Sequence, residues 1–155
     1  MANPIARFFA HLLLERPAAQ LGVDALVERL ETTRAPLAAY AAAAERAAGE
    51  RQLRHVIAIE RWGQNRLRVA LGDHAFERDV SRAYAPPEGE PLEALVERFD
   101  AVRAETVALA RRVAAEGVEG VKVEHNSLGP ISARAWLRYL HAHAELETKR
   151  AKPRR

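Results

Sequence analysis

The chain has 155 residues, 48% of them hydrophobic and 29% charged, which fits one globular domain with a buried core and excludes a disordered chain. It contains no cysteine. Disulfides, thiolate metal sites and a cysteine nucleophile are therefore excluded, and any metal has to be held by His, Asp or Glu.

The positive charge is concentrated at the C-terminal end. The formal net charge is +3, but five of the 24 cationic residues lie within 149–155, and without them 19 cationic residues stand against 21 acidic ones. Residues 151–155 are predicted to be a basic tail, and no nucleic-acid partner is expected, because phosphate binding requires cations clustered on the folded body. The apolar stretch 5–14 is too short to span a bilayer, so no membrane partner is expected and the cytoplasm is the expected location.

Helical periodicity dominates the first half of the chain. Residues 3–16 predict a short helix within an N-terminal extension, 1–21. Asp24 is a suitable cap for the first long helix. Its apolar positions at helical spacing are Leu26, Leu30, Leu37 and Tyr40.

Proline and glycine mark the next boundaries. Pro36 predicts either a kink or a junction of two helices near Thr33. Gly49 is expected to close this segment, and a second long helix is predicted from about residue 50 to residue 71. Residues 73–90 contain two prolines and a glycine and predict a long loop.

The second half of the chain predicts two more long helices. Pro91 suits the start of a helix with one apolar stripe that ends near Gly117. Residues 118–130 are irregular, with a locally extended stretch at 121–123, and Ser132 is expected to cap a helix that runs to about residue 149. The predicted fold is all-α: over residues 22–150, a four-helix bundle with a long crossover between its second and third helices.

The last predicted helix carries the pattern most suggestive of chemistry. Trp136, Leu140, His143 and Glu147 follow at spacings of four, three and four, so they share one face. A His and a Glu at i and i+4 present two ligands to one point, as a divalent metal requires. The alternative is structural: Glu147 lies in water at a fraying helix end and His143 is a partly buried histidine.

The second long helix offers two candidates for a third ligand. Glu60 falls in the middle of its apolar face and needs a partner if it is buried. His55 lies on an adjoining side, about 140° away on a helical wheel. Either residue could face the last helix, but the two are not expected to share one coordination sphere.

Three stretches together resemble the DinB/YfiT-like superfamily. Residues 54–62 (RHVIAIERW) are similar to its second-helix motif. Residues 84–87 (YAPP), with Phe99, Arg103, Glu105 and Thr106 further on, look like its crossover and third helix. Residues 128–132 (LGPIS), followed by 136–143 (WLRYLHAH), resemble the entry to its fourth helix. The resemblance covers roughly residues 22–150.

The resemblance implies a metal site. In that family a second-helix histidine and two fourth-helix histidines form a three-His site, and these fall on His55, His143 and position 147, which here is Glu147. The implied cofactor is a divalent ion such as Zn²⁺, Ni²⁺ or Mn²⁺, with the carboxylate favouring harder ions. Glu60 and His125 are the candidates for residues that do not bind the ion themselves but contact a residue that does.

The function that the resemblance implies is a metal-dependent enzyme acting on a small molecule. It is a transferase or isomerase that uses a low-molecular-weight thiol, or a hydrolase. The alternative is a non-catalytic helical protein with a decayed metal site, for which a homodimer is a candidate oligomer.

Overall fold

The computed structural model describes residues 3–33, 35, 37, 39 and 46–150. This part of the chain is mostly helical, as predicted, with four helices of 17 residues or more and one small antiparallel sheet. The elements in chain order are α1 (Pro4–Ala10), the π-helical turn η1 (His11–Glu15), α2 (Arg16–Thr32), α4 (Arg46–Ala70), the 3-10 turn η2 (Ser81–Tyr84), α5 (Leu92–Ala115), β1 (Lys122–His125), β2 (Gly129–Ser132) and α6 (Ala133–Arg150).

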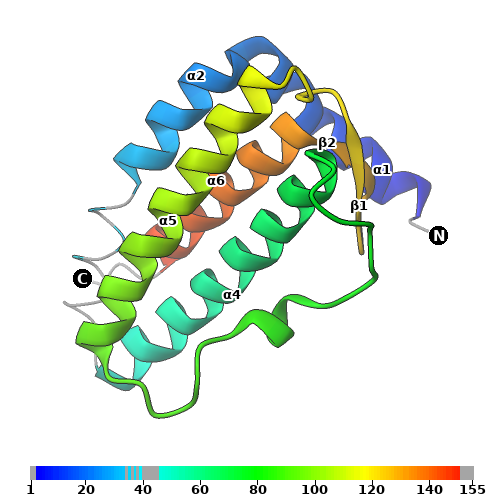
Figure 1. Cartoon of the computed structure of the whole chain (residues 1–155). Helices are drawn as coiled ribbons and strands as arrows, with labels where there is room; N and C mark the ends of the chain where they lie inside the picture. The colour runs from blue at the N-terminus through cyan, green and yellow to red at the C-terminus, as the bar shows by residue number, and fades with distance from the viewer. Residues whose placement is uncertain (1–2, 34, 36, 38, 40–45, 151–155) are drawn as a thin grey trace.

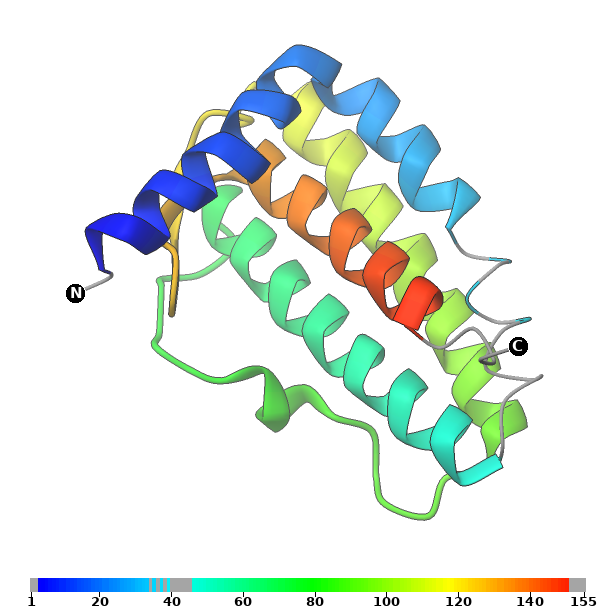
Figure 2. The same ribbon diagram turned by 180° about the vertical axis from the view of Figure 1, so that it is seen from behind.

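The four long helices lie side by side, and α1 and η1 extend α2 beyond one end of the group (Figure 1). Helix α4 packs against α5 and α6, and α2 packs against the same two helices. Helices α4 and α5 run in the same direction, while α2 and α6 run the opposite way (Figures 1 and 2). The segment that joins α4 to α5 therefore returns along the length of α4. Within the described ranges, no helix is both long and apolar enough to cross a bilayer.

Local sequence signals explain most of the helix boundaries. Pro91 precedes α5, where a missing N–H costs nothing. The Ser132 hydroxyl accepts a hydrogen bond from the Ala135 N–H at 3.2 Å and caps α6. The Glu15 carboxylate in turn accepts bonds from the Ser132 N–H and hydroxyl, both at 2.7 Å, and so fixes η1 to the start of α6.

Two boundaries differ from the prediction. Gly49 does not close a helix: it is buried inside α4, which begins at Arg46. A buried position tolerates glycine because packing outweighs its poor helix propensity. Helix α2 runs from Arg16 and leaves helical geometry at Gly22, where φ is 73°, two residues before the expected cap Asp24. Helix α2 ends at Thr32, next to the junction of two helices that was one of the two alternatives for Pro36. Pro36 itself and Tyr40 are outside the described residues.

The irregular stretch before α6 is a short β-ribbon. Strands β1 and β2 pair with Val123 opposite Ile131, and both side chains are buried. The Trp136 indole N–H donates to the Val123 carbonyl at 3.2 Å, which attaches the ribbon to the first turn of α6. The predicted extension at 121–123 is thus present but lies slightly later in the chain.

A buried ion pair connects three of the helices. The Glu60 and Arg103 side chains are each only 1% exposed, and Arg103 Nη2 donates to Glu60 Oε2 at 3.0 Å. Thr106 donates to the same carboxylate at 2.7 Å. Arg103 also donates to the Leu30 carbonyl of α2 at 3.0 Å. The hydrogen bonds satisfy the charges that burial would otherwise penalise.

Asp79 holds the segment between α4 and α5 against α4. Its carboxylate accepts hydrogen bonds from the Trp62 indole at 2.8 Å, from Asn65 at 3.1 Å, from the fully buried Arg66 and from the Tyr84 hydroxyl. Burial alone would raise the pKa of Asp79, but these bonds, that from Tyr84 foremost, hold it below its usual value. The Asp79 carboxylate thus joins this segment to three side chains of α4.

We expect Asp79→Ala to reduce the free energy of unfolding by about 3 kcal/mol, because it leaves the buried Arg66 charge without its partner. Urea denaturation followed by circular dichroism measures the change. Asp73→Ala is the matched control: it removes a carboxylate paired with Arg112 on the surface and should cost far less. Equal losses in the two variants would contradict the role given to Asp79.

Candidate metal centre

Three predicted side chains come together between α4 and α6. His55, His143 and Glu147 each offer one ligand atom, and these atoms all lie within 4.8 Å of one another. One pair, His55 Nε2 and His143 Nε2, is 3.1 Å apart. His55 is exposed, and the other two are half-buried. The spacing argument on α6 and the histidine singled out by the family resemblance therefore converge on one point.

The separation of the nitrogens fits a shared ion. Two ligand nitrogens at about 2.0–2.1 Å from one Zn²⁺ lie about 2.9–3.4 Å apart for angles between octahedral and tetrahedral values. The observed 3.1 Å falls inside this range. Two imidazoles and one carboxylate form a mixed nitrogen and oxygen donor set, which suits Zn²⁺, Ni²⁺ or Mn²⁺. The residues present thus fit the group that the resemblance implies.

Close packing of α4 on α6 sets the distance across the site. A Cβ built on Gly63 would lie 2.6 Å from Leu140 Cδ2, so a larger residue there would require the buried Leu140 side chain to move. The two helices are antiparallel, so the turns before Gly63 on α4 face the turns after Leu140 on α6 (Figure 2). His55 thereby comes opposite the turn that carries His143 and Glu147. A hydrogen bond also joins the two helices here, because the Gln52 side-chain amide donates to the Glu147 backbone carbonyl at 2.7 Å.

Glu60 is placed away from the three ligands. Its carboxylate is occupied by Arg103 and Thr106 of α5. The partner that a buried Glu60 requires is thus an arginine of α5. The ambiguity between Glu60 and His55 is thus resolved: His55 faces α6 and Glu60 faces α5.

His125 lies in an aromatic cluster near the site. Its ring centroid is 5.0 Å from those of Trp62 and Tyr139 and 5.1 Å from that of Trp136. Tyr139 in turn lies 6.1 Å from His143, so one ring separates His125 from the nearest candidate ligand. Among the described residues, Tyr139 lies between His125 and His143, and the supporting role of His125 stays a prediction.

The hydrogen bonds of His125 define its tautomer. Nδ1 accepts from the backbone N–H groups of Ser127 and Leu128, both at 3.2 Å, so the neutral ring carries its proton on Nε2. Nε2 is buried without a hydrogen-bond partner among the described residues. Burial, with a contribution from the Arg66 charge, lowers the pKa of His125 to about 4.

A cavity of about 400 Å³ opens beside the site, and no pattern in the sequence indicates it. It lies between the N-terminal helical segment and α6, and His143 belongs to its wall. Tyr139 also lines it, a residue that occurs in the family motif without an assigned role. Contacts between the N-terminal segment and α6 depend on tertiary packing, which spacing within one helix cannot reveal.

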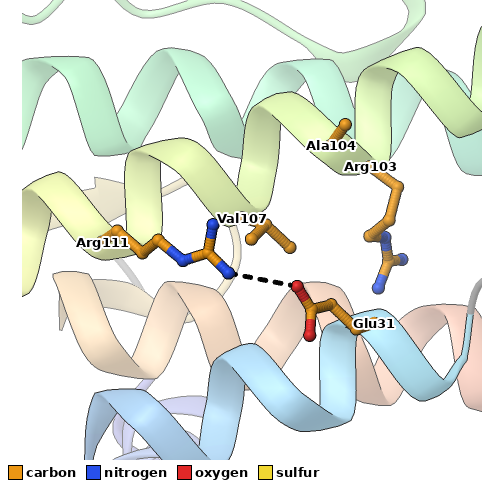
Figure 3. Close-up of a pocket in the computed structure, with 5 residues that line it drawn as sticks. All are labelled: Glu31, Arg103, Ala104, Val107 and Arg111. Carbon is orange, nitrogen blue, oxygen red and sulfur yellow. Dashed lines mark hydrogen bonds and ion pairs between the residues drawn. The ribbon is translucent and has the colours of Figure 1, made fainter.

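Two other cavities have linings that do not resemble this site. One of about 330 Å³ lies between α2 and α5, where Glu31 and Arg111 form an ion pair at 3.3 Å (Figure 3). Arg103 in its wall is committed to Glu60. Another, of about 540 Å³, is a charged groove along α5. The residues that line these two cavities include no histidine.

Titration of His125 is expected to make folding pH-dependent. Since the folded-state pKa is about 4, against an ordinary value of 6.5, neutral His125 contributes full stability above pH 6.5 and loses it as the pH falls towards 4. Lowering the pH from 7.5 to 4.5 should reduce the free energy of unfolding of the wild type by about 2 kcal/mol more than that of His125→Gln. Urea denaturation at both pH values measures this.

The control is His74→Gln, which removes an exposed histidine. It should retain the pH dependence of the wild type. An unchanged slope in His125→Gln would show that this ring does not carry the effect.

Comparison of the chain with known protein families, with characterised proteins and with solved structures finds no match.

Proposed function

We propose that this protein is a metal-dependent enzyme that acts on a small molecule, with the ion held by His55, His143 and Glu147. The observation that carries the proposal is the convergence of three ligand atoms, from two helices, within 4.8 Å. The same three residues follow from the i, i+4 spacing on the last helix together with the family resemblance. A chance cluster on the surface would have no reason to coincide with that prediction.

We further propose that the chain is a DinB-like four-helix bundle in which residues 71–91 form the crossover. The parallel run of α4 and α5 supports this, because a connection between parallel neighbours has to return along the group (Figure 1). The position of the site between the second and the last long helix agrees with the family pattern. The departure is Glu147, which stands where the family has a third histidine.

The side chains have separable roles in the proposed chemistry. A divalent ion held here lowers the pKa of a bound water or thiol and so supplies a nucleophile at neutral pH. His55 and His143 bind through neutral nitrogens, while Glu147 adds a negative charge that favours harder ions. Tyr139 lies beside the His143 ring, with the ring centroids 6.1 Å apart. The cavity beside His143 gives the substrate a place next to the site.

The resemblance suggests two substrate classes. One is a low-molecular-weight thiol together with a second small molecule, for a transfer or isomerisation reaction. The other is a small molecule that is hydrolysed.

Protein purified without a histidine tag is expected to contain close to one Zn²⁺, Ni²⁺ or Mn²⁺ per chain. Metal-free protein that fails to bind any of these ions would favour the alternative, a non-catalytic helical protein.

Glu147→Gln tests the ligand that departs from the family pattern. The substitution keeps the shape but removes the charge, so metal affinity should fall by about 100-fold or more, given that even supporting residues contribute about 10–100-fold. Glu147→His should retain or raise Zn²⁺ affinity. Isothermal titration with Zn²⁺ and Mn²⁺ measures both, and circular dichroism checks helicity. Glu145→Gln is the control on the same turn, and an equal loss there would contradict the assignment.

Gly63→Ala tests the spacing between the helices. Helix propensity alone would favour alanine by about 1 kcal/mol, but its methyl group would overlap Leu140 and push α6 away. Metal affinity should therefore fall by about tenfold, as for other changes that misplace a ligand. Gly120→Ala is the control, since a methyl group there meets nothing within 4 Å. Unchanged affinity in Gly63→Ala would show that the site does not depend on this contact.

A further inference from the structure

The cavity beside His143 has walls of mostly apolar side chains. Its volume of about 400 Å³ lies in the usual range for small-molecule sites, roughly 300–1,000 Å³. Phe9 and Leu13 line it from the N-terminal segment, and Leu128 from the β-ribbon turn. Tyr139, Ala142 and Leu146 line it from α6. Such a lining holds hydrocarbon or aromatic groups better than a polar or charged molecule.

The cavity and the candidate metal centre share one residue. Tyr139, Ala142, His143 and Leu146 follow at spacings of three, one and three, so they form one stripe along α6. His143 belongs both to this stripe and to the three-ligand cluster. A molecule lying in the cavity therefore has one end at His143, next to the proposed ion.

The depth of the cavity favours a small molecule over a protein surface. Its floor includes the buried side chains of Ala10 and Leu14, at 4% and 8% exposure, whereas Leu13 and Leu146 at the rim are more than half exposed. A helix from a second copy of the chain could cover the rim but would leave the floor empty. A slender ligand can reach the floor and bury apolar surface there, while Arg138 and Glu145 add two charged side chains to the lining.

We propose that this cavity binds the apolar body of the substrate, which is a small molecule with a hydrocarbon or aromatic chain and a head group that binds metal. The inference rests on the proposed function for its head group, but the apolar part stands on the cavity alone. It narrows the substrate from any small molecule to amphiphilic ones. The hydrocarbon or aromatic chain of the substrate lies along α6, and its head group lies at His143.

The test uses the full chain loaded with Zn²⁺ and a series of hydroxamates: aceto-, butano- and hexanohydroxamate. All three present the same metal-binding head group and differ only in alkyl length. Affinity measured by isothermal titration should rise by about threefold for each added methylene until the cavity is full. Equal affinity along the series would overturn the proposal and leave the metal centre standing.

Variants locate the effect. Ala142→Phe fills the cavity and should retain acetohydroxamate binding while removing the gain with chain length. Leu13→Asp, on an exposed position of the opposite wall, should reduce the same gain without depending on a change in α6. Ala108→Trp, an exposed position on α5, is the control and should bind as the wild type does. A gain with chain length that persists in both cavity variants would overturn the proposal.

A second measurement separates this inference from the proposed function. Metal-free protein labelled with ¹⁵N is titrated with 1-hexanol, and the amide signals of Leu13, Leu128 and Ala142 are followed. Shifts in the wild type that vanish in Ala142→Phe support the cavity even if no metal binds. Absence of shifts, or a dimer in sedimentation that Leu13→Asp dissociates without any ligand binding, overturns it in favour of an empty or a subunit-covered face.

Discussion

The contact between Gly63 and Leu140 is the constraint on which the site depends. Glycine inside a helix costs about 1 kcal/mol relative to alanine, so its presence in the middle of α4 requires compensation. The compensation is the approach of α6, since any side chain at Gly63 would meet Leu140 at 2.6 Å. Both helices continue without a break from this contact to the site, so the separation here constrains the separation at His143, about one turn away, and at His55, just over two turns away. It is there that the ring nitrogens of His55 and His143 come within 3.1 Å.

The opposite side of α4 is fixed by polar contacts. Glu60 is bound to Arg103, and Arg103 reaches the Leu30 carbonyl, so α2, α4 and α5 are held in one arrangement. A buried ion pair contributes little net stability, but removing one partner leaves an uncompensated charge, which disfavours other packings of the same helices. Helix α4 is thus fixed rotationally on the α5 side, and His55 is left on the α6 side. This rotation of α4 explains why Glu60 faces α5 while His55 faces α6.

Several features could be predicted from the sequence because each depends on spacing along one element or on a family motif. They are the mostly helical fold, the long loop before α5, the Ser132 cap and the convergence of His55, His143 and Glu147. The helix end predicted at Gly49 was wrong, because a glycine that packs in a core looks the same in a sequence as a glycine that ends a helix. Sequence reasoning found neither the Asp79 contacts nor the cavity at Leu13 and Leu128. Both join segments distant in the chain, and no local pattern records which segments meet. The choice between Glu60 and His55 likewise required knowing where Arg103 lies.

The surroundings of Glu147 argue against the fraying helix end that is the alternative to a metal ligand. The last carbonyl groups of a helix lack partners within it, and a helix end without other contacts opens readily. Here the Glu147 carbonyl accepts a hydrogen bond from Gln52 of α4 at 2.7 Å, which ties this turn to the helix that carries His55. The same carbonyls place partial negative charge at the C-terminal end of α6, where a cation is favoured. The features that keep the last turn of α6 ordered therefore also make it a suitable place for a divalent ion.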